Sequence, residues 1–305
     1  MSTRVHPQPV MSVAPITLKG APDRGAELQV KVSAPVNGDD LPIIIFSHGN
    51  GQSFHGYGPL ANHWAAQGFV VLQPTHLDAR LLGLSEHDPR RSQLWRFREQ
   101  DLLGVLDQIA LVETAVPALR ERLSTRIAVA GHSWGGQTAS VLLGATHSDP
   151  DDGSLVSRKD GRVTAGVLLA VPGRGGDSLS PLARRTFPFM DPDFSKMSPP
   201  TLVVAGDRDQ GHLTTRGPDW WRDAYDLSPG PKALLTLFGG EHSLGGIPGY
   251  EARETTDERP ERLLLIQQTT TEFLLSALGQ TREDWHQTLP PLAGAAKREG
   301  RIEIK

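Results

Sequence analysis

Short apolar runs alternate along the chain with longer segments whose apolar residues recur at helical spacing. The runs are rich in Val, Ile and Leu and almost unbroken, which is typical of strands covered on both faces. They lie at residues 41–49, 69–74, 126–131, 163–171, 201–206 and 232–238. Helical spacing occurs at residues 57–68, 97–112, 134–145, 216–226 and 260–278. This alternation predicts an α/β fold with a mainly parallel central sheet and helices on both of its faces.

Four further segments depart from this pattern. Residues 10–20 and 26–36 alternate between apolar and polar positions, which predicts antiparallel strands at one edge of the sheet. Residues 75–96 mix charges with Leu and Trp, and residues 173–199 are rich in Gly, Pro and Ser. Because both of these connections follow strands, they should emerge at the carboxyl edge of the sheet, where α/β proteins bind ligands. We therefore expect them to form lid-like loops over a pocket.

The length of 305 residues is compatible with one main domain, expected at residues 1–280. The connection from the strand ending near Val171 to the strand starting at Thr201 is too short for a large cap domain. Residues 281–305 are predicted to be a C-terminal tail, whose last five residues form either a short edge strand or a disordered end.

The composition removes several classes of function. The chain has no cysteine, which excludes thiol nucleophiles, thiolate metal sites and disulfides together. The net charge of −4 gives no electrostatic reason to expect nucleic acid or an anionic membrane as a partner. No apolar stretch approaches the roughly 20 residues of a membrane-spanning helix. The N-terminus lacks a basic segment followed by an apolar run, so the predicted location is cytoplasmic.

The segment Gly131-His-Ser-Trp-Gly135 places a serine between glycines, where a predicted strand ends and a predicted helix begins. A sharp turn there forces strained backbone angles on Ser133, and neighbours that carry a Cβ would clash. The turn lifts the hydroxyl clear of the sheet, and the first amides of the helix point toward any developing negative charge. The pattern therefore predicts that Ser133 is a nucleophile rather than a simple turn residue.

A serine hydroxyl is a poor nucleophile unless a base removes its proton. His242 follows the last predicted strand and two glycines, and it is the predicted base. Asp207 and Asp209 both follow the preceding strand, and either is placed to orient this histidine, with Asp177 as a third alternative. His212 lies only three residues past Asp209, so we expect a pocket-lining or surface role for it. Since each member of the set follows a different strand, all can converge at one edge of the sheet.

The order of serine, aspartate and histidine along the chain resembles that of the α/β-hydrolase superfamily. The resemblance runs from about residue 28 to 279. The segments FSHGNG, AAQGFVVLQPTH, GHSWGG, GDRD and GGEHS are similar to small serine esterases of the dienelactone-hydrolase-like, chlorophyllase-like and bacterial polyester-hydrolase-like branches. Such enzymes carry their acid in a G-x-x-D pattern, which implies Asp209 as the acid. Dienelactone hydrolases proper use a cysteine nucleophile, and this chain departs from them there.

Acyl transfer needs two backbone donors for the oxyanion. One is expected to be the amide of Trp134, the residue after the nucleophile, whose side chain should also help shape the substrate site. The other is expected in the loop after the strand at 41–49, at the amide of Asn50 between two glycines. His48 resembles the histidine of the superfamily's H-G pair, which implies that it braces this loop. The side chain of Gln52 is expected to contact substrate.

Other chemistries lack support in the sequence. The eleven histidines include no H-E-x-x-H pattern, and the glycine-rich loop has neither dinucleotide nor P-loop spacing, so we expect no metal and no cofactor. Adjacent Trp220 and Trp221 on a predicted helix cannot both face inward, so one is expected in the core and one at a pocket or the surface. A run of arginines interspersed with acids is interpreted as a solvated, self-paired face. It comprises Arg90, Arg91, Arg96 and Arg98.

The resemblance and the predicted site together imply a serine hydrolase that cleaves carboxylic esters, small or polymeric, through an acyl-enzyme. Trp134, Phe187 and Phe189 near the expected mouth favour a moderately apolar acyl or alcohol part. An amidase or a lactonase uses the same residues and is the nearest alternative. A non-catalytic binding protein on the same fold is a second alternative. The sequence gives no indication of the oligomeric state.

Overall fold

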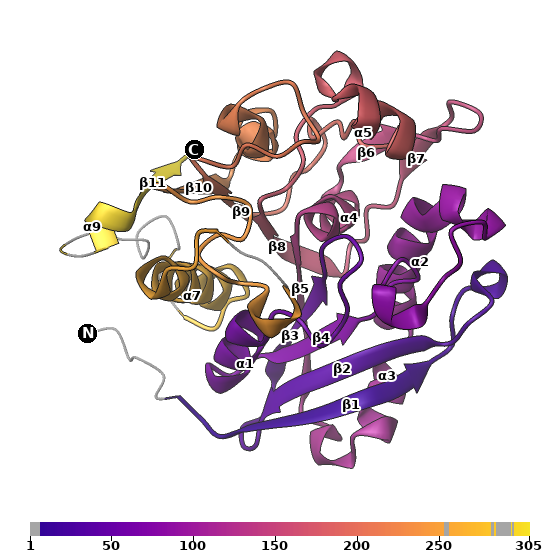
Figure 1. Ribbon diagram of the computed structural model, residues 1–305. Coiled ribbons are helices and arrows are strands. Elements are labelled where there is room, and N and C mark those ends of the chain that lie inside the picture. Colours follow the sequence, from indigo (N-terminus) through magenta and orange to yellow (C-terminus); the bar gives the residue numbers. More distant parts are fainter. Residues whose placement is uncertain (1–6, 253–255, 282–283, 285–293, 295) are drawn as a thin grey trace.

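A nine-stranded sheet runs through the centre of the protein in the computed structural model, which describes residues 7–252, 256–281, 284, 294 and 296–305 (Figure 1). The strand order across the sheet is β1-β2-β4-β3-β5-β8-β9-β10-β11. The bounds are β1 Val10–Leu18, β2 Leu28–Pro35, β3 Leu41–Ser47, β4 Val70–Pro74, β5 Leu123–His132, β8 Val163–Leu169, β9 Thr201–Gly206, β10 Lys232–Leu237 and β11 Gly300–Ile304.

The six inner strands from β4 to β10 are parallel, as the apolar runs predict. In this part of the sheet Ile44 pairs with Val71 of β4 on one side and with Ala128 of β5 on the other. The strands β1 and β2 are antiparallel to each other, and β2 is antiparallel to β4, which agrees with their alternating pattern. The last strand, β11, pairs antiparallel with β10, so the end of the predicted tail belongs to the sheet.

The main helices form two groups. α1 (Gly58–Ala66) packs beside α7 (Pro260–Ala277), and α2 (Leu94–Asp107) packs beside α4 (Trp134–Leu143) (Figure 1). The indole nitrogen of Trp64 donates to Thr270 Oγ1 at 2.9 Å and ties the first pair together. This is the arrangement of an α/β-hydrolase fold, and the described part of the chain adds no large cap to it.

The helix predicted at residues 97–112 is divided. α2 ends at Asp107, and α3 (Ile109–Ala115) follows after Gln108. The side chain of Gln108 both accepts from the amide of Lys19 and donates to its carbonyl, which holds this residue against the end of β1. The break thus coincides with a tertiary contact, which helical periodicity cannot reveal.

Shorter elements fill the connections. A small hairpin of β6 and β7, which the apolar pattern did not predict, lies between α4 and β8. The predicted helix at 216–226 is a 3-10 turn followed by a short α6. Their bounds are β6 Thr146–Ser148, β7 Leu155–Ser157, η1 Pro22–Arg24, η2 Arg80–Leu82, η3 Pro89–Gln93, η4 Pro117–Leu119, η5 Gly176–Ser178, α5 Pro181–Thr186, η6 Pro218–Arg222, α6 Asp223–Asp226, η7 Gly249–Glu251 and α9 Ala296–Glu299.

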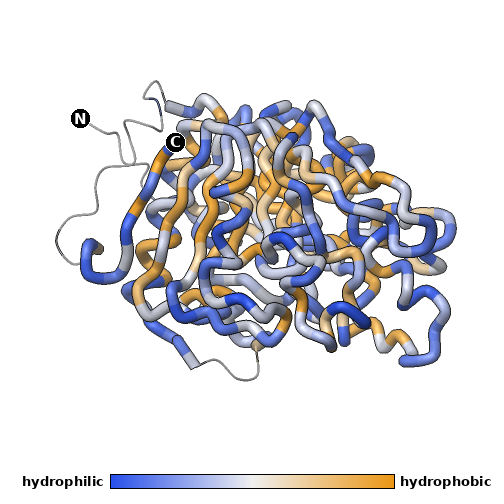
Figure 2. Tube along the Cα trace, turned by 90° about the horizontal axis from the view of Figure 1, so that it is seen from above, coloured by the Kyte–Doolittle hydropathy of each residue, from blue (hydrophilic) through white to orange (hydrophobic). Residues whose placement is uncertain are grey.

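The core lies on both faces of the inner strands. Consecutive residues Ile43, Ile44 and Ile45 of β3 are all fully buried, as they must be in a strand with helices above and below it. Figure 2 shows the same distribution for the whole chain, with apolar segments inside and polar ones on the outer connections. Among the described helices, none has both the length and the apolar character needed to cross a bilayer.

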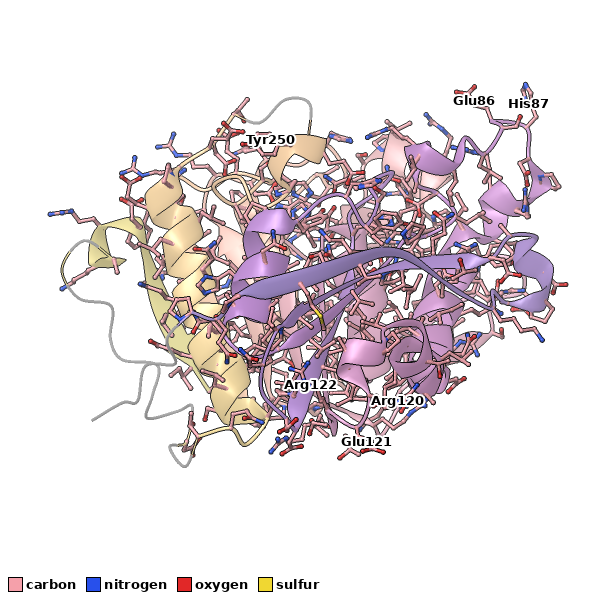
Figure 3. All side chains as sticks on the ribbon, turned by 90° about the horizontal axis from the view of Figure 1, so that it is seen from below. Glu86, His87, Arg120, Glu121, Arg122 and Tyr250 are labelled. Atoms are coloured by element: carbon pink, nitrogen blue, oxygen red, sulfur yellow. The ribbon has the colours of Figure 1, made fainter. Side chains whose placement is uncertain are left out.

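The two edges of the parallel strands lie on opposite sides of the molecule (Figure 3). Glu86, His87 and Tyr250, in connections that follow β4 and β10, lie on one side, whereas the Arg120–Arg122 segment that precedes β5 lies on the other. The first side is the carboxyl edge, where the predicted site residues are.

Candidate active site

Ser133 occupies the turn between β5 and α4, with φ of 56° and ψ of −127°. A Cβ at Gly131 would lie 2.2 Å from the carbonyl oxygen of Gly135, and one at Gly135 would lie 2.1 Å from the carbonyl oxygen of Ser47. The turn therefore requires glycine at both positions. The amide of Ser133 donates to the carbonyl of Leu169 at 2.9 Å, which fixes the turn to β8.

His242 joins Ser133 to Asp209. Its Nε2 lies 2.9 Å from Ser133 Oγ, and its Nδ1 lies 2.7 Å from Asp209 Oδ2. A carboxylate oxygen can only accept here, so Nδ1 carries the proton and Nε2 is free to accept from the hydroxyl. The Asp209 side chain is 1% exposed and the His242 side chain 39% exposed, so the linkage runs from the interior to solvent.

The neighbours of His242 hold it in this position. Trp221 donates from its indole nitrogen to the carbonyl of Asp209 at 2.9 Å, and its ring centroid lies 4.8 Å from that of His242. Asp257, which is buried, accepts from the amides of Glu241 and Gly245 at 2.7 and 3.1 Å. The acid and the loop that carries the histidine are thus each fixed by a separate contact.

The alternative residues considered from the sequence lie elsewhere. Asp207 is exposed and accepts from the amide of Gly239. Asp177 is exposed and lies 4.0 Å from Arg184, and His212 is exposed. Of the carboxyl groups considered, Asp209 is the one that the structure brings to His242.

The loop after β3 contains Asn50, which is exposed, between Gly49 and Gly51, whose φ is +69°. Within the described residues, the backbone amides of Asn50 and of Trp134, the first residue of α4, donate to no protein acceptor. Neither N–H is therefore committed to another group of the described chain. His48 donates from Nδ1 to the carbonyl of Gly49 at 2.7 Å and accepts the amide of His76 on Nε2, so it braces the loop.

The side chain of Trp134 lies deeper than we expected from the sequence. It is 4% exposed and packs between Phe187, Phe189 and the guanidinium of Arg98. It therefore supports the site from beneath and offers little surface to a substrate. Phe187 and Phe189 belong to the long connection at 173–199, which brings that connection to the site.

A hydrogen-bonded chain runs beside Ser133, and two of its members, His132 and Tyr57, were not predicted from the sequence. His132 donates from Nε2 to the carbonyl of His242 at 2.8 Å, and its Nδ1 lies 2.9 Å from the hydroxyl of Tyr57. That hydroxyl also contacts the side chain of Gln52 and accepts the amide of Gly49. Gln52 is half-buried and held by Tyr57. In the sequence, the position of His132 directly before Ser133 was the signal that could have pointed to this chain.

Acid is expected to destabilise the unchanged protein more steeply than a His132→Gln variant. Burial lowers the pKa of His132 to about 3, whereas an unfolded histidine titrates near about 6.5. Between these two pKa values, His132 binds a proton in the unfolded state but not in the folded state. The stability that neutral His132 contributes is therefore complete above the unfolded pKa and is lost as pH falls below it. The difference should approach about 1.4 kcal/mol per pH unit. Urea unfolding of both proteins between neutral and mildly acidic pH measures it, and parallel pH dependences would contradict it.

The interpretation of the arginine run as a solvated face is wrong for Arg98. Arg90 and Arg96 are partly exposed and pair with Asp88 and Asp149. Arg98, however, is fully buried and paired with Asp78, 20 positions earlier in the chain. On a helix, neighbouring charges in the sequence point in different directions, and α2 turns this one toward the sheet.

The expectation for the two adjacent tryptophans is also wrong, since Trp220 and Trp221 are both fully buried. They lie in a 3-10 turn with its own packing rather than on one face of an α-helix. Trp220 donates to the carbonyl of Arg174 at 2.6 Å, while Trp221 reaches Asp209. Each indole nitrogen thus finds a backbone acceptor, which makes the burial of both rings favourable.

Metal-ligating side chains do not gather elsewhere in the described part of the chain: no group of three or more His, Cys, Asp or Glu residues there is placed to hold an ion.

The strand order, the serine turn and the position of His242 are those of the α/β-hydrolase fold. Residues 25–82 match the family model of platelet-activating factor acetylhydrolase, isoform II. This part runs from β2 past β4 and includes the loop of Asn50, but it ends before Ser133. No curated protein matches the chain.

Proposed function

We propose that the protein is a serine hydrolase that cleaves carboxylic esters. The observation that carries this proposal is the pair of hydrogen bonds from Ser133 through His242 to Asp209, 2.9 and 2.7 Å long, at the carboxyl edge of an α/β-hydrolase sheet. The unused amides of Asn50 and Trp134 beside it supply what an oxyanion needs.

In the proposed reaction, His242 Nε2 takes the proton of Ser133 as its oxygen attacks the ester carbonyl carbon. The amides of Asn50 and Trp134 stabilise the oxyanion. The bond to the leaving oxygen then breaks, and His242 returns the proton to that oxygen. In the second half of the reaction, His242 takes a proton from water as the water oxygen attacks the acyl carbon. The bond to Ser133 then breaks, His242 returns the proton to Ser133 Oγ, and the carboxylic acid leaves. Asp209 keeps the proton of the imidazole on Nδ1 and stabilises the imidazolium.

Esters are favoured over amides and lactones by the family match, because the matched family is described as an acetylhydrolase. The match includes the loop that supplies one of the two proposed oxyanion donors. Because that description names an acetyl group, we propose that the substrate is an ester with a short acyl group. An amidase or lactonase remains the alternative on the same residues, since protonation of the leaving group is what separates these reactions.

We expect the protein to hydrolyse a series of p-nitrophenyl esters of increasing acyl length, with acetate or butyrate as the preferred members. A fluorophosphonate probe should label Ser133, and peptide mass analysis would locate the adduct. Comparison with p-nitroanilide amides of the same acyl groups tests the amidase alternative. Absence of turnover for every ester, together with no labelling of Ser133, would overturn the proposal and favour a binding protein.

A further inference from the structure

Arg98 is a fully buried cation on α2, and its guanidinium contacts the loop of Asn50 directly. Nη1 donates to the carbonyl of His48 at 2.9 Å, and Nη2 donates to the carbonyl of Gly49 at 3.1 Å. Nε and Nη2 also donate to the two carboxylate oxygens of Asp78, at 2.9 and 3.1 Å. One side chain thus holds two consecutive peptide groups of the loop.

The second of these peptide groups is the one that carries the Asn50 amide. The bond between Gly49 and Asn50 is trans, since the cis bonds of the described chain are at Ala14-Pro15 and Gly230-Pro231. In a planar trans peptide the N–H points opposite to the C=O. The carbonyl of Gly49 accepts from the guanidinium, from His48 Nδ1 and from the amide of Gln52. The amide of Asn50 is therefore directed away from Arg98. A cation on the carbonyl also polarises the peptide and strengthens the N–H as a donor.

Asp78 holds the loop on the other side of Asn50. Its Oδ2 accepts the amide of Gly51 at 2.8 Å. Burial alone would raise the pKa of Asp78, but the positive charge of Arg98 holds this pKa well below its usual range. Asp78 is therefore ionised at neutral pH, and the peptides before and after Asn50 are held by the two members of one ion pair.

The same guanidinium contacts the side chain of the residue whose amide is the other proposed oxyanion donor. Its carbon lies 4.4 Å from the ring centroid of Trp134, within the range of a cation–π contact. Trp134 follows Ser133 and supplies the second amide. Arg98 thus contacts the loop that carries one proposed donor and the side chain of the residue that supplies the other.

We propose that Arg98 and Asp78 are positioning residues that orient the Asn50 amide toward the oxyanion and couple it to Trp134. This inference rests on the proposed ester hydrolysis. A purely structural ion pair would also be buried and would also place its N–H groups on backbone carbonyls. The two roles differ in what their loss changes: stability alone, or the stabilisation of the transition state.

The test compares Asp78→Asn, Arg98→Lys and Arg98→Met with the unchanged protein on p-nitrophenyl acetate. Loss of one oxyanion donor lowers kcat by about 10²–10³-fold, and we expect this fall for Arg98→Met, with KM changed by less than about threefold. Affinity for a trifluoromethyl ketone, whose adduct with Ser133 carries the oxyanion, should fall in parallel. Asp78→Asn keeps an oxygen for the Gly51 amide and should lose less than Arg98→Met.

Lys232→Met is the matched control. Lys232 is also fully buried, and its Nζ donates to the carbonyls of Pro199 and Pro231. It lies at the start of β10, at the amino edge of the sheet, whereas Ser133 lies at the carboxyl edge. Its loss should lower the melting temperature while leaving kcat and inhibitor affinity unchanged. The positioning role is wrong if the Arg98 and Asp78 variants lower only the melting temperature, as expected for Lys232→Met, while kcat per folded molecule and inhibitor affinity stay unchanged.

A second measurement needs no turnover. The orientation of the Asn50 N–H vector, obtained from residual dipolar couplings, should change in Asp78→Asn and Arg98→Lys and remain the same in Lys232→Met. An unchanged vector in the first two variants would overturn the inference even if the protein is an active esterase. If the unchanged protein hydrolyses no ester, the function proposal fails by itself, and the vector still decides whether the ion pair orients this amide.

Discussion

Replacement of Ser133 by alanine is expected to lower kcat for ester hydrolysis on the order of a million-fold. The substitution removes Ser133 Oγ, which lies 2.9 Å from His242 Nε2, so no acyl-enzyme can form on this residue. Activity above the rate in water, from the oxyanion donors and binding alone, should persist at a level of about 10³–10⁴-fold. Steady-state rates on p-nitrophenyl acetate and mass analysis after fluorophosphonate treatment measure both effects.

Ser140→Ala is the control for this change. Ser140 is a buried serine of the same helix, α4, and its hydroxyl donates to the carbonyl of Gln137 at 2.7 Å. This variant should retain labelling and turnover, and both variants should unfold near the temperature of the unchanged protein. Full activity in Ser133→Ala would mean that the nucleophile is another residue.

Asp209→Asn is expected to lower kcat by about 10⁴-fold while leaving the fold intact. The carboxylate accepts the Nδ1 proton of His242 at 2.7 Å. An amide can offer an N–H there instead, which favours the tautomer with the proton on Nε2 and removes the acceptor for the serine proton. The imidazolium that forms during the reaction also loses its counter-charge. Rates measured across neutral pH, together with circular dichroism, separate this effect from unfolding.

Asp207→Asn is the matched comparison, two positions away. Asp207 is exposed and accepts the amide of Gly239, so its replacement should leave turnover nearly unchanged. If Asp207→Asn abolishes activity while Asp209→Asn does not, the proposed acid is wrong.

The sheet was predictable because buried parallel strands give unbroken apolar runs, and such runs are visible without any knowledge of neighbours. The meeting of Ser133, Asp209 and His242 was predictable for a related reason. Each follows a different strand, and parallel strands deliver their carboxyl ends to the same edge. The sequence therefore indicated where these three side chains would meet.

The supports of the site were not predictable in the same way. Arg98 looks like a surface charge in the sequence, because its partner Asp78 lies in a connection without regular pattern. Tyr57 reaches His132 across 75 positions of the chain. For the last five residues the sequence left an edge strand and a disordered end open, and the pairing of β11 with β10 selects the edge strand. Each of these contacts depends on the tertiary arrangement, which spacing along the chain does not encode.

Ser133 has a positive φ that glycine adopts freely and serine does not. Such a conformation costs about 1–3 kcal/mol at one residue. Selection of variants for heat resistance alone would therefore favour glycine at this position, and the stabilised molecule would lack its hydroxyl. Stability and reactivity oppose each other here. A programme to make the protein more robust should keep to the amino edge of the sheet, around Arg120–Arg122, and screen every variant for turnover.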